Sequence, residues 1–140
     1  FLIRDPGPML ESLGEKLPDF DLLATGLPQQ VEIFEHVARA TGRVPPVVDA
    51  ADLLAAPEPV LRALCGALGV PFTLRMLHWP PGPRATDGVW ARHWYERVER
   101  SSGFEPVSAG EQPRLTGRLA EMEAQCRPMY EKLRAHRIMA

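Results

Sequence analysis

The feature that most limits what this chain can fold into is its shortage of strands. Only two runs have the apolar, β-branched composition of a covered strand, and they are residues 1–3 (FLI) and 44–49 (VPPVVD). Two strands alone do not make a stable sheet in water. The sequence therefore predicts that residues 1–140 are a portion of one longer domain, and that its first three residues are an interior strand of that domain.

Helices account for most of the remaining pattern. Apolar spacings of three and four residues predict them over residues 8 to 14 or 18, 28–41, 57–68, 90–100 and about 115–133, with Pro128 forcing a kink or a restart in the last. The helix, tight turn and strand in sequence over 28–49 are typical of a parallel sheet. The predicted fold class is α/β, a parallel sheet flanked by helices and mostly helical within these residues.

Two packing expectations follow from the strand shortage. The apolar faces of residues 1–3 and 47–48 should be only partly covered, so the chain should aggregate or form a homodimer through exposed strand edges. Residues 70–72 (VPF) are expected to pack back toward the core after a helix that stops at Gly69.

The composition excludes several classes of partner. A net charge of −2 gives no basic field for duplex nucleic acid, and no window approaches the ~18–20 apolar residues of a membrane span. Cys65 and Cys126 lie on apolar helical faces and are expected to be buried thiols in a reducing, cytoplasmic compartment. The four histidines lack metal-ligand spacing, so no metal site is expected.

One stretch near the start has the features of an anion site. The motifs GxxxxGK[ST], GxGxxG and GxSxG are absent. Arg4 closes the first strand, Asp5 and Pro6 turn the chain, and Ser12 is expected about one turn into the next helix, near its positive end. Ligands bind at that edge of open α/β sheets. Two interpretations remain open, an anion site or an arginine paired with a local carboxylate.

Several segments, in this order and spacing, resemble the C-terminal half of the P-loop sulfotransferase family. They are Arg4-Asp5-Pro6 followed by Ser12, residues 47–49 with 52–54, and the run 57–72 (PEPVLRALCGALGVPF). The segment Gly88 to Tyr95 (GVWARHWY) is similar to one in bacterial sulfotransferase-like proteins. The resemblance covers nearly the whole chain. It implies a parallel sheet flanked by helices and, as sulfuryl donor, 3′-phosphoadenylyl sulfate (PAPS).

The resemblance also implies site residues. Arg4 and Ser12 match the arginine and serine, eight apart, that hold the donor's 3′-phosphate. The family's Arg-Lys-Gly loop falls near Arg84, which no Lys-Gly follows, and Arg84 and Gly88 are the implied further contacts with the nucleotide. The catalytic base and the loop for the 5′-phosphosulfate belong to the N-terminal half of the family domain, so the catalytic residues are unknown.

Two functional hypotheses result. The first is a PAPS-dependent sulfotransferase that transfers a sulfuryl group to a hydroxyl or amine of a small-molecule acceptor. The second is a non-catalytic sulfotransferase-like module for binding or interaction, which could be fused to another enzyme. The departure after Arg84 motivates it, as does a partner surface formed by Trp79, Trp90 and Trp94.

Overall fold

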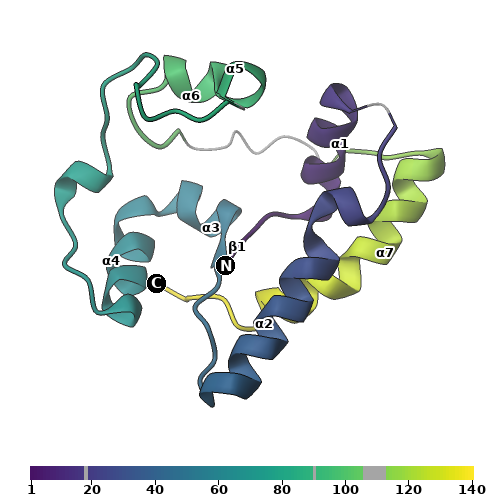
Figure 1. Ribbon diagram of the computed structural model, residues 1–140, viewed down its shortest axis with the longest axis horizontal. Helices are drawn as coiled ribbons and strands as arrows, with labels where there is room; N and C mark the ends of the chain where they lie inside the picture. Colours follow the sequence, from purple (N-terminus) through teal and green to yellow (C-terminus); the bar gives the residue numbers. More distant parts are fainter. Residues whose placement is uncertain (18, 90, 106–112) are drawn as a thin grey trace.

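A short parallel strand pair lies at the centre of the structure (Figure 1). The computed structural model describes residues 1–17, 19–89, 91–105 and 113–140. Strand β1 (Leu2–Ile3) pairs with β2 (Val48–Asp49), with Leu2 opposite Val48 and Ile3 opposite Asp49. The chain is otherwise mostly helical, which is compatible with the predicted α/β class.

Helices surround this pair. In chain order they are α1 (Pro6–Lys16), the 3₁₀ helix η1 (Leu23–Thr25), α2 (Leu27–Thr41), α3 (Ala50–Ala55), α4 (Pro57–Leu68), the 3₁₀ helix η2 (Leu74–Met76), α5 (Ala91–Trp94), α6 (Glu96–Arg100) and α7 (Gly117–Arg134). None of the helices in the described ranges is long and apolar enough to cross a membrane.

The predicted helices are present, and three details differ. Helix α1 begins two residues early, at Pro6, because the Asp5 side chain caps it by accepting a hydrogen bond from the Gly7 amide. The segment predicted as one helix over 90–100 contains two short helices, α5 and α6, on either side of Tyr95. Of the kink or restart predicted at Pro128, the restart does not occur: helix α7 continues through the proline, because buried residues on both sides hold it to the core.

The core forms where α7 packs against α1 and α2 (Figure 1). Its buried members are Ile3, Leu10, Phe20, Leu27, Phe34, Val47, Met122, Cys126, Tyr130 and Leu133. The predicted partial exposure of the strand faces is wrong for Ile3, Val47 and Val48, which are at most 5% exposed, and correct for Leu2, which is 60% exposed. Ile3 and Val47 belong to the same buried cluster as residues of α2 and α7, so these helices contribute cover that the sequence pattern did not assign to them.

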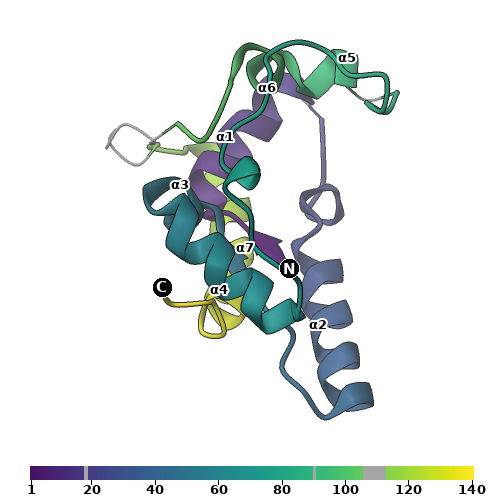
Figure 2. The same ribbon diagram turned by 90° about the vertical axis from the view of Figure 1, so that its left-hand side faces the viewer.

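The segment after α4 lies apart from this core. Val70 is 47% exposed, so the predicted packing of residues 70–72 toward the core is wrong for Val70. In two perpendicular views, α5 and α6 lie together at one end of the molecule, away from β1 (Figures 1 and 2). The Trp79 ring NH donates to Ser101 Oγ at 3.0 Å, and its ring meets the Phe104 ring edge-on. Trp79 therefore stabilises this segment internally.

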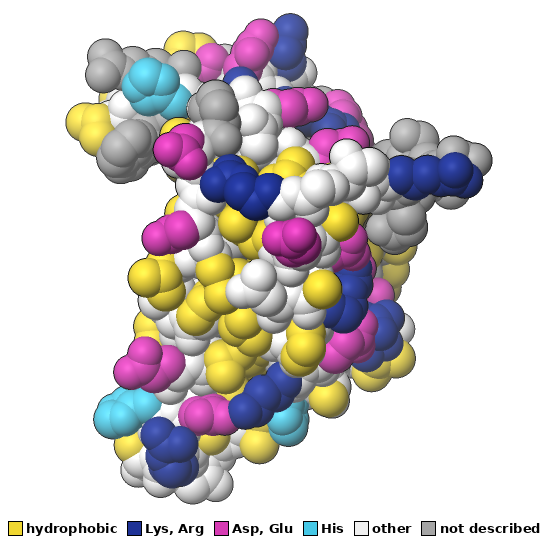
Figure 3. Space-filling model, turned by 90° about the vertical axis from the view of Figure 1, so that its right-hand side faces the viewer, with side chains coloured by type: hydrophobic (Ala, Val, Ile, Leu, Met, Phe, Trp, Pro, Cys, Tyr) yellow, Lys and Arg dark blue, Asp and Glu magenta, His cyan; other side chains and the backbone are white. Residues whose placement is uncertain are grey.

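Figure 3 shows the side of the molecule on which α2 and α7 lie. Hydrophobic side chains gather over the middle of this face, and charged side chains occupy much of its margin. Ile33 of α2 and Leu23 of η1 are among the exposed large hydrophobic residues, at 53% and 59%.

Candidate functional site

The turn between β1 and α1 carries the strongest candidate for ligand binding. Arg4 follows the last residue of β1, and the next residue, Asp5, is the N-cap of α1. The Arg4 side chain is exposed and forms no hydrogen bond or ion pair with the part of the chain that the structure describes. Its guanidinium is therefore available to an anion at the carboxyl end of the strand.

The backbone amides of α1 contribute little to such a site. Pro6 and Pro8 have no N–H, the Gly7 amide donates to Asp5 Oδ1 at 3.0 Å, and the Met9 amide donates to the Asp5 carbonyl at 3.1 Å. A helix N-terminus binds anions through free amides in its first turn. Because these amides are absent or engaged, an anion here must be held mainly by side chains.

The Asp5 carboxylate is itself bound by Arg127, a residue of α7. Arg127 donates to it through both terminal nitrogens, at 2.6 and 3.1 Å, and one of these nitrogens also donates to Glu123 at 2.5 Å. Partial burial acts to raise the pKa of Asp5. The hydrogen bonds from Arg127 and from the Gly7 amide, with the charge of Arg127, outweigh burial and lower this pKa. Asp5 is thus a paired carboxylate with a structural role.

A second carboxylate, that of Asp49, lies at the end of β2 and likewise caps the helix that follows. Asp49 is 3% exposed, caps α3 by accepting from the Ala51 amide at 2.9 Å, and accepts a 2.6 Å hydrogen bond from the Tyr130 hydroxyl. Arg134 lies 3.6 Å from the same carboxylate oxygen. Burial, with this hydrogen bond and the charge of Asp49, raises the pKa of Tyr130. The hydroxyl therefore stays protonated and serves as a donor.

The α7 residues in these networks were missed when the sequence was interpreted. Arg127, Tyr130 and Arg134 follow one another at spacings of three and four, which places them on one helix face. The apolar spacing by itself indicates which face of this helix is buried, and it gives no role to these three polar residues. A polar triplet at helical spacing, in a chain with an aspartate at or shortly after the end of each predicted strand, is the signal that could have found them.

The other predicted site residues lie in two different places. Ser12 is the seventh residue of α1, about 9 Å along the helix axis from Pro6, so it lies nearly two turns in and the predicted single turn is wrong. It is half-buried and has no hydrogen-bond partner for its hydroxyl among the described residues. Given its spacing from Arg4, the Ser12 hydroxyl remains a candidate for contact with the same ligand as Arg4.

Arg84 and Gly88 flank a turn at the far end of the molecule. The Arg84 amide donates to Asp87 Oδ2 at 2.7 Å, and the Gly88 carbonyl accepts from the Ala91 amide. Both residues are exposed. None of the hydrogen bonds or ion pairs recorded for the described residues joins either of them to Arg4 or Ser12. Nor are β1 and α1 among the main packing partners of α5 and α6.

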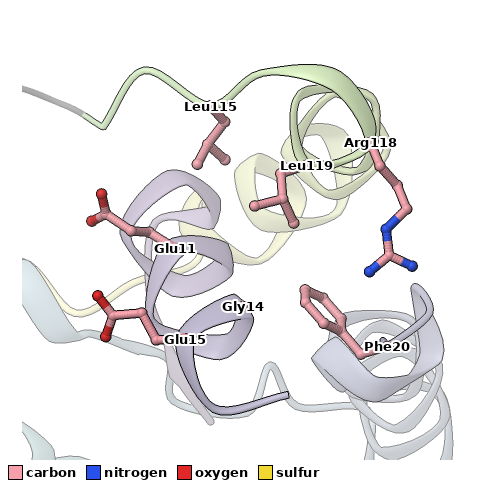
Figure 4. Close-up of a pocket in the computed structure, with 7 residues that line it drawn as sticks. All are labelled: Glu11, Gly14, Glu15, Phe20, Leu115, Arg118 and Leu119. Carbon is pink, nitrogen blue, oxygen red and sulfur yellow. The ribbon is translucent and has the colours of Figure 1, made fainter. Parts of the chain in front are cut away.

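A shallow pocket lies at the other end of α1 from Arg4 (Figure 4). It has a volume of about 450 Å³, and its lining residues are Glu11, Gly14, Glu15, Phe20, Leu115, Arg118 and Leu119. Glu11 and Glu15 project from α1, and Phe20, Leu115 and Leu119 form its apolar part. The pocket contains none of the predicted site residues, so it is separate from the β1–α1 turn.

The remaining candidate groups in the described residues are the cysteines and the possible metal ligands. Cys65 and Cys126 are free and buried, as predicted, and burial raises the pKa of the Cys126 thiol. Within the described ranges there is no group of three or more metal-ligating side chains.

Comparison with known proteins gives a family and two relatives. The family model described as "sulfotransferase domain" matches residues 1–137. The chain is 38% identical over 137 residues to Branched-chain-amino-acid aminotransferase-like protein 2 of Arabidopsis thaliana, and 40% identical over the same length to protein 1 of that name. Each alignment covers 96% of this chain and 24% of the relative, so the chain spans about a quarter of their length. No solved structure matches the chain.

Proposed function

The chain belongs to the sulfotransferase domain family, and from this membership we propose that it forms the part of a PAPS-dependent sulfotransferase that binds the donor's 3′-phosphate. The observation that carries the proposal is the exposed Arg4 guanidinium. It lies at the carboxyl end of a parallel strand and has no partner among the described residues. The same observation disfavours the alternative in which Arg4 pairs with a local carboxylate, because Arg127 occupies the nearest one in sequence, Asp5.

The chemistry of the donor fits these residues. A guanidinium donates two parallel hydrogen bonds to phosphate oxygens, and such charge-assisted bonds are about twice as strong as neutral ones. Ser12 would add one hydroxyl, and Arg84 and Gly88 are proposed as further contacts with the nucleotide. The engaged amides of α1 make the side chains the main donors, so Arg4 should dominate recognition of the 3′-phosphate.

In the proposed reaction, a hydroxyl or amine of a small-molecule acceptor attacks the sulfur of PAPS. The bond between sulfur and the bridging phosphate oxygen breaks, adenosine 3′,5′-bisphosphate leaves, and the acceptor oxygen or nitrogen releases its proton. The residues described here bind and orient the donor, which is the main contribution of a protein to transfers of this kind. We further propose a reducing, cytoplasmic setting, which the two buried free thiols support.

Calorimetric titration of the full-length protein with adenosine 3′,5′-bisphosphate tests the proposal. Binding with a clear preference over adenosine 5′-monophosphate is the expected result. A hydrogen bond to a charged group contributes about 1.5–3 kcal/mol, so Arg4→Ala should weaken bisphosphate binding at least about tenfold. Ser12→Ala should weaken it less, and both losses should shrink with the monophosphate. No binding at millimolar ligand, or equal losses for both nucleotides, would refute the site.

A non-catalytic binding module is the second candidate. It is favoured by the names and lengths of the relatives, since this domain forms about a quarter of proteins called aminotransferase-like. The two candidates differ in turnover. A protein that binds the bisphosphate but transfers no sulfuryl group from labelled PAPS to any of a panel of phenols and amines would support the module.

A further inference from the structure

Arg4 is followed in sequence by a carboxylate that would interfere with an anion site. A free Asp5 side chain could pair with the Arg4 guanidinium, and its negative charge would repel a phosphate. In the structure this carboxylate faces Arg127, which lies 122 residues further along the chain. The pairing removes the nearest competitor in sequence for Arg4.

Arg127 and Asp5 form a partly buried ion pair with two hydrogen bonds at the β1–α1 turn. Arg127 approaches Asp5 with two nitrogens, and one of these nitrogens also donates to Glu123, one turn earlier in α7. The Asp5 and Arg127 side chains are 24% and 35% exposed, so water screens their interaction less than that of a fully exposed pair. A two-point contact of this kind fixes orientation as well as charge.

The backbone of Arg4 is held on both sides as a result. Before it, Ile3 pairs with Asp49 in the sheet and its side chain is 2% exposed. After it, Asp5 is fixed by the Gly7 amide and by Arg127. The Arg4 side chain thus extends from a fixed backbone position, which reduces the ordering that anion binding must impose.

We propose that Arg127 is a positioning residue for phosphate binding: by pairing with Asp5 it keeps the Asp5 carboxylate from pairing with Arg4. The proposal rests on the proposed function, and it deepens that function by assigning a role to a residue that need not touch the nucleotide. It also explains why an acidic N-cap is tolerated next to an anion site.

The test is a set of calorimetric titrations of the full-length protein with adenosine 3′,5′-bisphosphate and adenosine 5′-monophosphate. Arg127→Gln should weaken bisphosphate binding about fivefold and monophosphate binding less than about twofold. Arg39→Gln is the matched control, since Arg39 forms an exposed ion pair with Glu35 on α2 and should leave both affinities unchanged.

Removal of the carboxylate separates positioning from a general structural role. Asparagine is as good an N-cap as aspartate, so Asp5→Asn should preserve the cap and leave bisphosphate affinity undiminished. Added to Arg127→Gln, it should restore bisphosphate affinity to within about twofold of the wild type, because the competitor for Arg4 is gone. Arg127→Lys, which keeps the charge but not the two-point contact, should show a smaller loss that Asp5→Asn also restores.

The outcomes are distinguishable. If the wild-type protein shows no preference for the bisphosphate, the proposed function fails and this inference falls with it. If the preference exists and Arg127→Gln leaves it unchanged, or Asp5→Asn does not restore what Arg127→Gln removes, Arg127 is a structural residue only. If Arg127→Gln does not fold, Arg127→Lys takes its place, because the lysine charge maintains the pair with Asp5. The loss of bisphosphate affinity and its restoration by Asp5→Asn are then measured for that variant.

Discussion

Asp5 and Asp49 show how single residues join the strands to the rest of the molecule. Each lies at or just after the end of a strand, caps the helix that follows, and accepts a hydrogen bond from a side chain of α7. The two partners differ in kind, since Asp5 has a charged donor and Asp49 a phenolic one. The consequences of breaking each contact should differ accordingly.

The pair between Asp5 and Arg127 should make stability depend on pH. The pKa of Asp5 is lowered in the folded state, so its contribution is present above the ordinary value of 3.8 and is lost as the pH falls through the folded value. The difference in free energy of unfolding between wild type and Asp5→Asn should therefore narrow as the pH falls from about 7 to about 3.

Urea unfolding at each pH measures this difference. Asp19→Asn is the control, because the Asp19 side chain is fully exposed and its 3.4 Å contact with Arg118 should contribute little at any pH. A difference for Asp5→Asn that stays constant over the range would contradict the role of the Asp5 charge.

The hydroxyl of Tyr130 should contribute measurably to stability. Tyr130→Phe leaves the buried Asp49 carboxylate without its 2.6 Å donor, so the free energy of unfolding should fall by about 1–3 kcal/mol. Tyr95→Phe is a matched control at a residue that is 39% exposed, and it should change stability by less than about 0.5 kcal/mol. Equal effects in urea unfolding would show that the hydroxyl of Tyr130 is dispensable.

Among the secondary-structure elements, helix α4 ends at a glycine C-cap, Gly69. The Gly69 amide donates to the carbonyls of Cys65 and Gly66, and Gly69 has a φ of 67°, in the left-handed region that favours glycine. An added Cβ at Gly69 would meet no atom within 4 Å, so the cost of a substitution is one of backbone conformation alone.

Two glycine substitutions in and after α4 should have opposite signs. Gly69→Ala should destabilise the protein by about 1–2 kcal/mol, because alanine disfavours positive φ. Gly66→Ala, inside the helix and also without a neighbour within 4 Å, should stabilise it by about 0.5–1 kcal/mol. Thermal unfolding of both variants measures the contrast, and two changes of the same sign would contradict the C-cap assignment.

At the scale of the whole molecule, α7 connects the parts that the chain order separates. It packs against α1, α2 and β1, and its side chains reach the end of each strand. The strand pair stays small, and in the described part of the chain β1 pairs only with β2. The other edge of β1 has no strand partner among the described residues, and the Leu2 side chain is 60% exposed.

The open edge predicts self-association of the 140-residue chain. Light scattering after size-exclusion chromatography should show a dimer or larger species, and Leu2→Glu should shift it toward monomer, because a charge on an edge strand opposes pairing. Leu74→Glu, at a residue that is 62% exposed in η2, should leave the distribution unchanged. A wild-type chain that is monomeric at every concentration would refute self-association through the edge of β1.

Local patterns in the sequence by themselves determined the elements and part of the candidate site. The apolar spacing and the proline and glycine boundaries identified α2 and α4, because helix starts and stops depend on neighbouring residues. The strand followed by Arg4, Asp5 and Pro6 likewise identified a turn. The order and spacing of several segments carried the resemblance to the sulfotransferase family, which the comparison with known families confirmed.

Only the tertiary structure decided which side chains meet across long stretches of chain. Asp5 and Arg127 are 122 residues apart, and Asp49 and Tyr130 are 81 apart, so no local pattern relates them. The coverage of Ile3 and Val47 was likewise fixed by helices distant in sequence. Pairing of this kind depends on how α7 packs against the strand ends, and packing joins residues by their positions in space. The fold thus determined that Asp5 pairs with Arg127 and that Arg4 has no partner in the described part of the chain.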